Sequence, residues 1–262
     1  MRRVGVLGHG FIGAALVEAL GRAPERGVEV AFVYNRSPAR LDGVPPALRL
    51  DRLDQMLDRG CDLIVETAHP DFTRDWGERI LAVADYMPLS LSALIDDGLL
   101  ARLTAVAERS GRRLYLPHGA LIGTDNLVEW RAMWDTVEIT FVKNPAHIDF
   151  SASGIDPTGI EARTVVYDGP VRGIAGLFPR NVNTMVTCAL ATIGLDRCVG
   201  RLIAQPGSVT ASIEVVARGR DGSELHLIKV QPMAGVSGTE MVASTLASLY
   251  RAVGADSTVA FV

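Results

Sequence analysis

The chain has 262 residues, of which 48% are hydrophobic and 21% charged, a balance typical of a globular protein and not of a disordered one. Its formal net charge of −4 provides no basic surface for nucleic acid or an anionic membrane. No run of about 18 apolar residues is present to span a bilayer, so we expect a cytoplasmic protein. Three scattered cysteines, without a CxxC pair, predict buried thiols and neither a disulfide framework nor a metal site.

The first half of the chain alternates predicted strands and helices. The apolar run Val4–Leu7 predicts a strand, and the segment AALVEALGRA after it predicts an amphipathic helix. The same reading predicts strands at 28–34, 63–65 and 113–116, and helices at about 72–84 and 97–110. This order predicts an α/β fold with a parallel, doubly wound sheet.

After Pro117 the pattern changes to that of a mixed α/β domain. Strands are predicted at 136–142, 164–167, 212–217 and 224–230, with a helix at 181–193 and a last helix at about 239–253. We therefore expect a nucleotide-binding domain over residues 1–120 and a substrate and dimerisation domain over 121–238. The last segment, 239–262, is expected to pack back on the first domain.

A glycine-rich turn, GHGFIG at 8–13, joins the first predicted strand to the first helix. The pattern GxGxxG in this strand–turn–helix context is typical of a Rossmann domain. The first glycine permits a tight turn, the second lets the backbone approach a pyrophosphate, and the third lets helix and strand pack closely. We predict that NAD(P) is bound by Gly8, Gly10, Phe11, Ile12 and Gly13, with its phosphates at the helix N-terminus.

The residues after the second predicted strand indicate which nicotinamide cofactor is preferred. An acidic residue there would bind the ribose 2′-hydroxyl of NAD. This chain has Asn35, Arg36 and Ser37 instead, and a guanidinium with a hydroxyl suits a 2′-phosphate better. The sequence therefore favours NADP, with NAD as the alternative. Ala68 and His69, in the turn after the third predicted strand, are expected to line the same edge of the sheet.

Five further segments carry a resemblance to a known family: Val33–Leu50, Val65–Pro70, Leu116–Leu127, Thr164–Gly173 and Leu177–Met185. They resemble the L-aspartate dehydrogenase family, in particular the animal aspartate dehydrogenase domain-containing proteins. The resemblance implies a Rossmann domain with a mixed α/β substrate domain, usually in a homodimer. It also implies a reversible, NAD(P)-dependent oxidative deamination of aspartate through iminosuccinate to oxaloacetate.

The resemblance also implies two further cofactor contacts, Ala120 and Asn183. Ala120 follows a predicted strand, at the edge where ligands bind in open α/β sheets. Asn183 is expected to bind the nicotinamide carboxamide, with a helix-capping role as the alternative.

One departure from the family concerns proton transfer. The family has a catalytic histidine shortly before a strand, in an Asn-x-His-Glu-like segment. Here that histidine corresponds to Ile213 when the sequences are aligned without a gap, or to Ala211 when they are aligned on the acidic residue that follows. Neither side chain transfers a proton. A family lysine before the last helix also corresponds to Gly238.

Other residues are candidates for the chemistry. His118, two residues before Ala120, is the histidine we expect to act as acid and base, with an ordinary loop role as the alternative. Lys143 and Arg180 are expected to bind substrate carboxylates, with Lys229 as a weaker candidate. Each of these cations has a surface or helix-terminus charge as its alternative reading.

The leading hypothesis is an NAD(P)-dependent oxidoreductase that acts on the amine or imine of a small amino acid, with aspartate as the first substrate to try. One alternative is an imine reductase, or a dehydrogenase of another amino acid or 2-oxo acid. The other is a catalytically weak NAD(P)-binding protein. The absent histidine favours both alternatives over the first reading.

Overall fold

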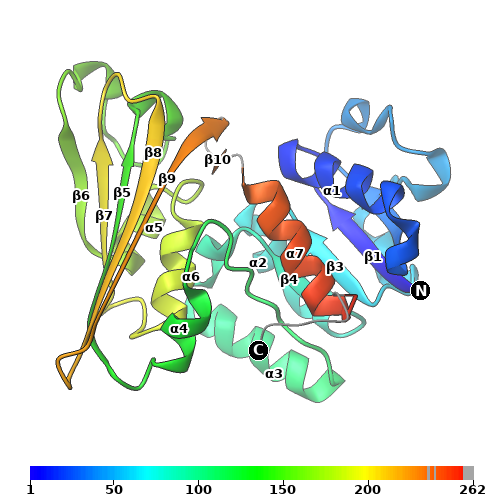
Figure 1. Ribbon diagram of the computed structural model, residues 1–262. Helices are drawn as coiled ribbons and strands as arrows, with labels where there is room; N and C mark the ends of the chain where they lie inside the picture. The colour runs from blue at the N-terminus through cyan, green and yellow to red at the C-terminus, as the bar shows by residue number, and fades with distance from the viewer. Residues whose placement is uncertain (235–236, 239, 256–262) are drawn as a thin grey trace. The chain divides into compact units, whose positions relative to one another are not determined.

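The computed structural model describes residues 1–234, 237–238 and 240–255. The chain divides into two compact units, and most of their helices and strands are labelled in Figure 1. Unit 1 contains Met1–Pro117 together with the described residues from Val242 on, and unit 2 contains His118–Met241. Unit 1 is therefore made of two separate stretches of sequence, and unit 2 of one.

Unit 1 is built on a parallel sheet. Its strands, in spatial order and within the described residues, are β2 (Val28–Tyr34), β1 (Arg2–Leu7), β3 (Leu63–Glu66) and β4 (Asp85–Pro88). All four residues of β3 and the last four of β1 are buried. Continuous burial of this kind arises when both faces of a parallel sheet are covered, and the prediction of a parallel sheet is confirmed.

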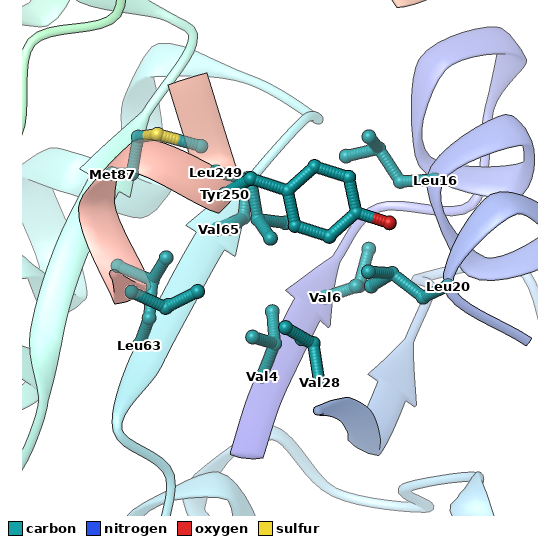
Figure 2. Close-up of a cluster of buried hydrophobic side chains, with 11 residues drawn as sticks. Val4, Val6, Leu16, Leu20, Val28, Leu63, Val65, Met87, Leu249 and Tyr250 are labelled. Atoms are coloured by element: carbon teal, nitrogen blue, oxygen red, sulfur yellow. The ribbon is translucent and has the colours of Figure 1, made fainter. Parts of the chain in front are cut away.

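Helices cover both faces of this sheet. α1 (Phe11–Arg22) and α7 (Met241–Val253) pack on one face, and Figure 2 shows Tyr250 of α7 among side chains of α1, β1 and β3. α2 (Pro70–Leu81) and α3 (Asp97–Ser110) pack together at Gly77. Gly77 of α2 also lies near Tyr86 of β4. Met87, the next residue on β4, belongs to the cluster under α1 and α7, so Tyr86 and α2 lie on the other face of the sheet. The core of unit 1 therefore has two layers of helix around one sheet.

The fourth strand differs from the prediction. Residues 113–116 form no strand but a single bridge, between Leu114 and Tyr86. The strand beside β3 is β4, whose short sequence DYMP gave no signal because it combines an acidic residue with a proline. The segment 113–116 lies between Gly111, which ends α3 with a φ of 65°, and Pro117, so little of it is available for pairing.

Unit 2 contains a mixed sheet, as predicted. Its strands, in spatial order and counting described residues only, are β10 (Ser237–Gly238), β9 (Glu224–Ala234), β8 (Thr210–Gly219), β5 (Trp134–Lys143), β7 (Val199–Ala204) and β6 (Thr164–Pro170). β5 and β7 are parallel, and the other neighbours are antiparallel. The helices of this unit are α4 (Thr124–Glu129), α5 (Val171–Leu177) and α6 (Asn183–Ala191).

One face of this sheet is buried, and we call it the inner face. Burial alternates from Val137 to the end of β5 and from the start of β8 to Ala217, so that Phe141, Lys143, Ala211 and Ile213 all point inward. On β9 the residues facing the same way are less exposed than their neighbours. α6 is buried along most of its length, as expected of an apolar helix inside a domain.

Two further expectations concern the whole chain. Within the described residues, every helix is too short or too polar to cross a lipid bilayer. The three cysteines are buried and carry no disulfide, as predicted.

Candidate functional site

The glycine-rich turn has the geometry that its sequence predicts. Gly8 has a φ of 97°, which favours glycine. A Cβ on Gly13 would lie 2.0 Å from the carbonyl oxygen of Gly8, so only glycine fits where α1 starts beside β1. A Cβ on Gly10 would meet nothing within 4 Å. Gly10 therefore has open space above it, as a site for an approaching ligand requires.

The N-terminus of α1 is suited to an anion. Its N-cap residue, Gly10, provides no side-chain cap, and the first turn of α1 has no acidic residue. The first N–H groups of a helix lack partners within the helix and attract negative charge. Phe11 exposes 56% of its surface beside them. This arrangement fits the pyrophosphate of a dinucleotide.

Asn35 connects the end of β2 to the glycine-rich turn. Its Oδ1 accepts a hydrogen bond from the His9 backbone N–H at 3.0 Å, and its Nδ2 donates to the Ser37 carbonyl at 3.0 Å. The His9 ring lies 2.7 Å from the carbonyl of Arg40. The loop after β2 is thereby held against the turn that β1 leads into.

A cavity of about 220 Å³ opens at the same edge of the sheet. It is lined by Tyr34, Asn35, Arg36, Pro38, Leu41, Arg49, Leu50 and Asp51. The guanidinium of Arg49 donates to the carbonyls of Val44 and Asp42, at 2.7 and 2.9 Å. Arg36 is exposed and has no ion pair with any described residue. The cavity therefore offers one available cation, with the carboxylate of Asp51 also on its wall.

Sequence reasoning missed Glu66, the last residue of β3. It is fully buried and accepts hydrogen bonds from the Ala68 N–H and from both the N–H and the hydroxyl of Ser90. Burial raises the pKa of Glu66 to about 7, although these donors act to lower it. An acidic residue that ends an otherwise apolar strand was the available signal. Glu66 fixes the loops that follow β3 and β4.

Ala68 and His69 follow Glu66 at this edge. The Ala68 side chain lies next to Gly8, since a Cβ on that glycine would come within 2.9 Å of it. His69 is the N-cap of α2 and accepts from the Asp71 N–H at 3.3 Å, with an ion-pair distance of 3.0 Å to the Asp71 carboxylate. His69 thus has a structural task, whereas Ala68 lies against the glycine-rich turn.

In unit 2 the segment around Ala120 forms a turn. The Leu121 N–H donates to the His118 carbonyl at 2.9 Å, and Gly119 between them has a φ of 58°. The Lys229 amine donates to the Ala120 carbonyl at 2.6 Å and to Glu240 at 2.9 Å. This turn also lies beside α6, because a Cβ on Gly119 would be 3.6 Å from the hydroxyl of Thr184. His118, Ala120 and the start of α6 are therefore brought together.

The remaining predicted residues have different surroundings. Asn183 is the first residue of α6, whose N-cap is Val182, so the helix-capping alternative does not apply. Lys143 is only 5% exposed, which excludes the surface-charge alternative, and burial lowers its pKa to about 8. Arg180 has a 58% exposed side chain and pairs with Asp149 at 3.0 Å. Of the two predicted carboxylate-binding cations, Lys143 is the buried one.

Both halves of the chain match known families. Residues 8–117 match the sequence model of the NAD-binding domain of homoserine dehydrogenase, and residues 128–253 that of the C-terminal domain of aspartate dehydrogenase. The chain is 39% identical to an aspartate dehydrogenase domain-containing protein of Xenopus tropicalis, over 78% of this chain and 75% of that protein. It is 30% identical to L-aspartate dehydrogenase 1 of Bordetella pertussis, over 94% and 96%. The chain belongs to the aspartate dehydrogenase family.

A solved structure agrees with this assignment at the level of the fold. The crystal structure of aspartate dehydrogenase from Thermotoga maritima matches with a TM-score of 0.76 and 24% identity, over 100% of this chain and 99% of that chain. The predicted Rossmann domain and mixed α/β domain are confirmed. As a member of the aspartate dehydrogenase family, the protein is an oxidoreductase with an NAD-binding domain.

The two positions to which the resemblance assigns the family's histidine, Ile213 and Ala211, lie on β8 and point to the inner face. Ile213 is opposite Lys229 on β9 and Phe141 on β5, and Ala211 is opposite Gln231 on β9. His226, by contrast, lies on the outer face, where its ring nitrogen is 2.6 Å from Glu214. The polar inner-face residues on the strands next to Ile213 and Ala211 are thus Lys143, Lys229 and Gln231.

Proposed function

We propose that this protein catalyses the reversible NAD(P)-dependent conversion of aspartate, through iminosuccinate, to oxaloacetate and ammonia. One observation carries the proposal: the relationship to an L-aspartate dehydrogenase covers 94% of this chain and includes both units. The nicotinamide, when bound, supplies the oxidant for the carbon–nitrogen bond, and the residues of this chain bind and orient the partners and move protons.

Cofactor binding is assigned to unit 1. The residues around the glycine-rich turn and the N-terminus of α1 would hold the pyrophosphate, and Arg36 would face a 2′-phosphate in the cavity after β2. An exposed guanidinium without an ion pair among the described residues supports a preference for NADP over NAD. Ala68, Ala120 and Asn183 are the further cofactor contacts that we propose.

Substrate binding is assigned to unit 2. His118 is the histidine proposed to transfer protons, at a turn that Lys229 ties to β9. Lys143 and Arg180 are the cations proposed for the substrate carboxylates. Since Lys143 is buried and Arg180 is paired with Asp149, we expect a larger loss of substrate affinity when Lys143 is replaced than when Arg180 is.

One assay tests the proposed reaction. Purified protein is incubated with ammonia, NADPH or NADH, and a panel of 2-oxo acids that includes oxaloacetate, and cofactor oxidation is followed by absorbance. Turnover with oxaloacetate supports the proposal. Turnover with another acid alone would assign a different substrate, which the replacement of the family histidine favours. Cofactor binding without turnover of any acid would indicate a binding protein.

The family resemblance further leads us to propose a homodimer in the cytoplasm. Three buried cysteines without a disulfide are consistent with a reducing compartment. Light scattering during size-exclusion chromatography tests the dimer, for which the expected mass is twice the 28.0 kDa of the chain. Fractionation of the source cells tests the compartment.

A further inference from the structure

Lysine is rare in this chain, and its two occurrences lie close together. Among the 26 basic residues of the sequence, 24 are arginine, and only Lys143 and Lys229 are lysine. Lys143 ends β5 and Lys229 lies on β9, so they flank β8 on the inner face of one sheet. The two amines are thus neighbours in a chain whose other cationic side chains are guanidinium groups, which do not lose a proton at physiological pH.

The two amines have different partners. Lys229 donates to the Ala120 carbonyl and to the carboxylate of Glu240, so its ammonium form is held by two acceptors. Lys143 makes no hydrogen bond or ion pair with any described residue, and its amine lies 5.1 Å from the centre of the Phe141 ring. Of the two, Lys143 is therefore the amine whose hydrogen-bonding capacity is not used by the described residues.

The surroundings of Lys143 bring the titration of its amine closer to neutral pH. Burial lowers its pKa to about 8, and the positive charge of Lys229 acts in the same direction. The negative charge of Glu240 acts in the opposite direction. Among the described residues these are the two charged groups that act on it. An amine that titrates near the working pH can both accept and donate a proton, which arginine cannot do.

The position of Lys143 relates it to the missing histidine. In the pairing of β5 with β8, Phe141 is opposite Ile213 and Val142 is opposite Ser212, so the next position on β5, Lys143, continues toward Ala211. The amine thus stands on the strand beside both positions that the family's imidazole would occupy, and on the same face of the sheet. The space that the imidazole would fill is bordered by Lys143, Lys229 and Gln231.

From this geometry we propose that Lys143, and not His118, is the acid–base residue of the reaction, which replaces the carboxylate-binding role given to Lys143 above. The inference rests on the proposed function. In the deamination direction the neutral amine takes one proton from the α-ammonium of the substrate. The substrate then loses a hydride to the oxidised nicotinamide cofactor and becomes an iminium ion. Water then adds to the iminium ion: its oxygen bonds to the carbon as a hydroxyl, and one proton goes to the nitrogen. When the carbon–nitrogen bond breaks, the hydroxyl proton goes to the departing ammonia, which leaves as ammonium. The proton on Lys143 passes to solvent.

Because the chain has two lysines, the titration of Lys143 can be measured directly. Protein labelled with ¹³C and ¹⁵N in lysine alone gives two side-chain amine signals, which the Lys229→Arg variant assigns. We expect the Lys143 signal to titrate at about pH 8, against about 10.4 for an unperturbed lysine. A midpoint above 10 overturns the proposal. The measurement needs neither substrate nor cofactor, so it decides on Lys143 even if the proposed reaction fails.

Kinetics then separate proton transfer from charge. With whichever 2-oxo acid or amino acid turns over, Lys143→Met and Lys143→Arg should each lower kcat at least about a hundredfold. In the wild type, kcat/KM for deamination should rise with pH up to about 8, and Lys143→Ala should recover turnover when a small primary amine is added. Lys229→Arg should keep the pH dependence even where its rate is lower. A Lys143→Arg variant that retains kcat and raises only KM would assign Lys143 to carboxylate binding and refute the proposal.

Discussion

Ile213 of β8 lies directly opposite Lys229 of β9, and two residues away on the same face Ala211 lies opposite Gln231. The polar groups around the positions to which the resemblance assigns the family's histidine therefore come from neighbouring strands. This relationship can be tested by returning an imidazole to β8.

We predict that Ala211→His partly restores the activity of the Lys143→Met variant, by at least about tenfold. The pH dependence should move toward the pKa of an imidazole, about 6.5. Ala211→Gln is the matched control, since it adds a side chain of similar size without a titrating group. Equal recovery with histidine and glutamine would show that filled space, not proton transfer, accounts for the effect. Rates measured from pH 5.5 to 9.5 decide between them.

The glycine-rich turn gives a prediction with two internal controls. Gly13→Ala should lower the free energy of unfolding by about 1–3 kcal/mol, because its Cβ meets the Gly8 carbonyl at 2.0 Å. Gly10→Ala should change stability by less than about 1 kcal/mol, since its Cβ meets nothing, yet weaken NADPH binding at least about tenfold. Gly21→Ala, exposed within α1, should stabilise by up to about 1 kcal/mol and leave binding unchanged. Denaturant unfolding and fluorescence titration provide the two readouts.

Cofactor preference should depend on Arg36. Arg36→Ala is expected to weaken NADPH binding by about tenfold to a hundredfold, the loss of one charge-assisted hydrogen bond, with NADH affinity little changed. Asp51→Asn, which removes the acidic group from the same cavity, should tighten NADPH binding. Arg40→Ala, a neighbouring exposed arginine outside the cavity lining, serves as the control. The assignment fails if Arg36→Ala lowers the affinities for NADPH and NADH equally.

Glu66 predicts how stability changes with pH. Its pKa is about 7 in the folded protein, above its ordinary 4.5, so the folded state holds a proton that the unfolded state releases between these values. The contribution of Glu66 to stability is therefore fully present below about pH 4.5, and about 3 kcal/mol of it is lost as pH rises through 7. Glu66→Gln should abolish this part of the pH dependence, whatever its effect at a single pH. Parallel slopes for the two proteins between pH 5 and 7.5 would contradict the prediction.

Local patterns in the sequence were sufficient for most of unit 1. The context of GHGFIG fixed the turn, and α3 has the predicted bounds with its C-cap at Gly111. In unit 2, β7 and α5 were missed because each contains glycine that weakens its propensity. Those glycines are explained only by packing. Gly173 leaves room for the Tyr167 hydroxyl, and a Cβ on Gly200 would come within 3.3 Å of Ile174 and Met185.

The residues of the candidate site also fall into those that local sequence patterns predict and those that only the folded structure brings together. The glycine-rich turn and Arg36 each lie in a short local stretch of sequence and were predicted from it. The grouping of Lys143 with Lys229 and Glu240 depends on the register of β5, β8 and β9, and strands 70 residues apart carry no mutual signal in one sequence. Glu66 was missed for a related reason, since its partner Ser90 follows a strand that was not predicted.

The return of α7 to unit 1 has a consequence for the order in which the protein is made. Leu249, Tyr250 and Val253 complete the hydrophobic core that covers β1 and β3, yet the ribosome adds them after all of unit 2. The core of unit 1 therefore stays incomplete, with one face of its sheet partly uncovered, until α7 has been synthesised. Unit 2 is one continuous stretch of sequence, so we expect it to complete its fold before unit 1 does. The N-terminal sequence of unit 1 is thus synthesised first, but its hydrophobic core is completed last.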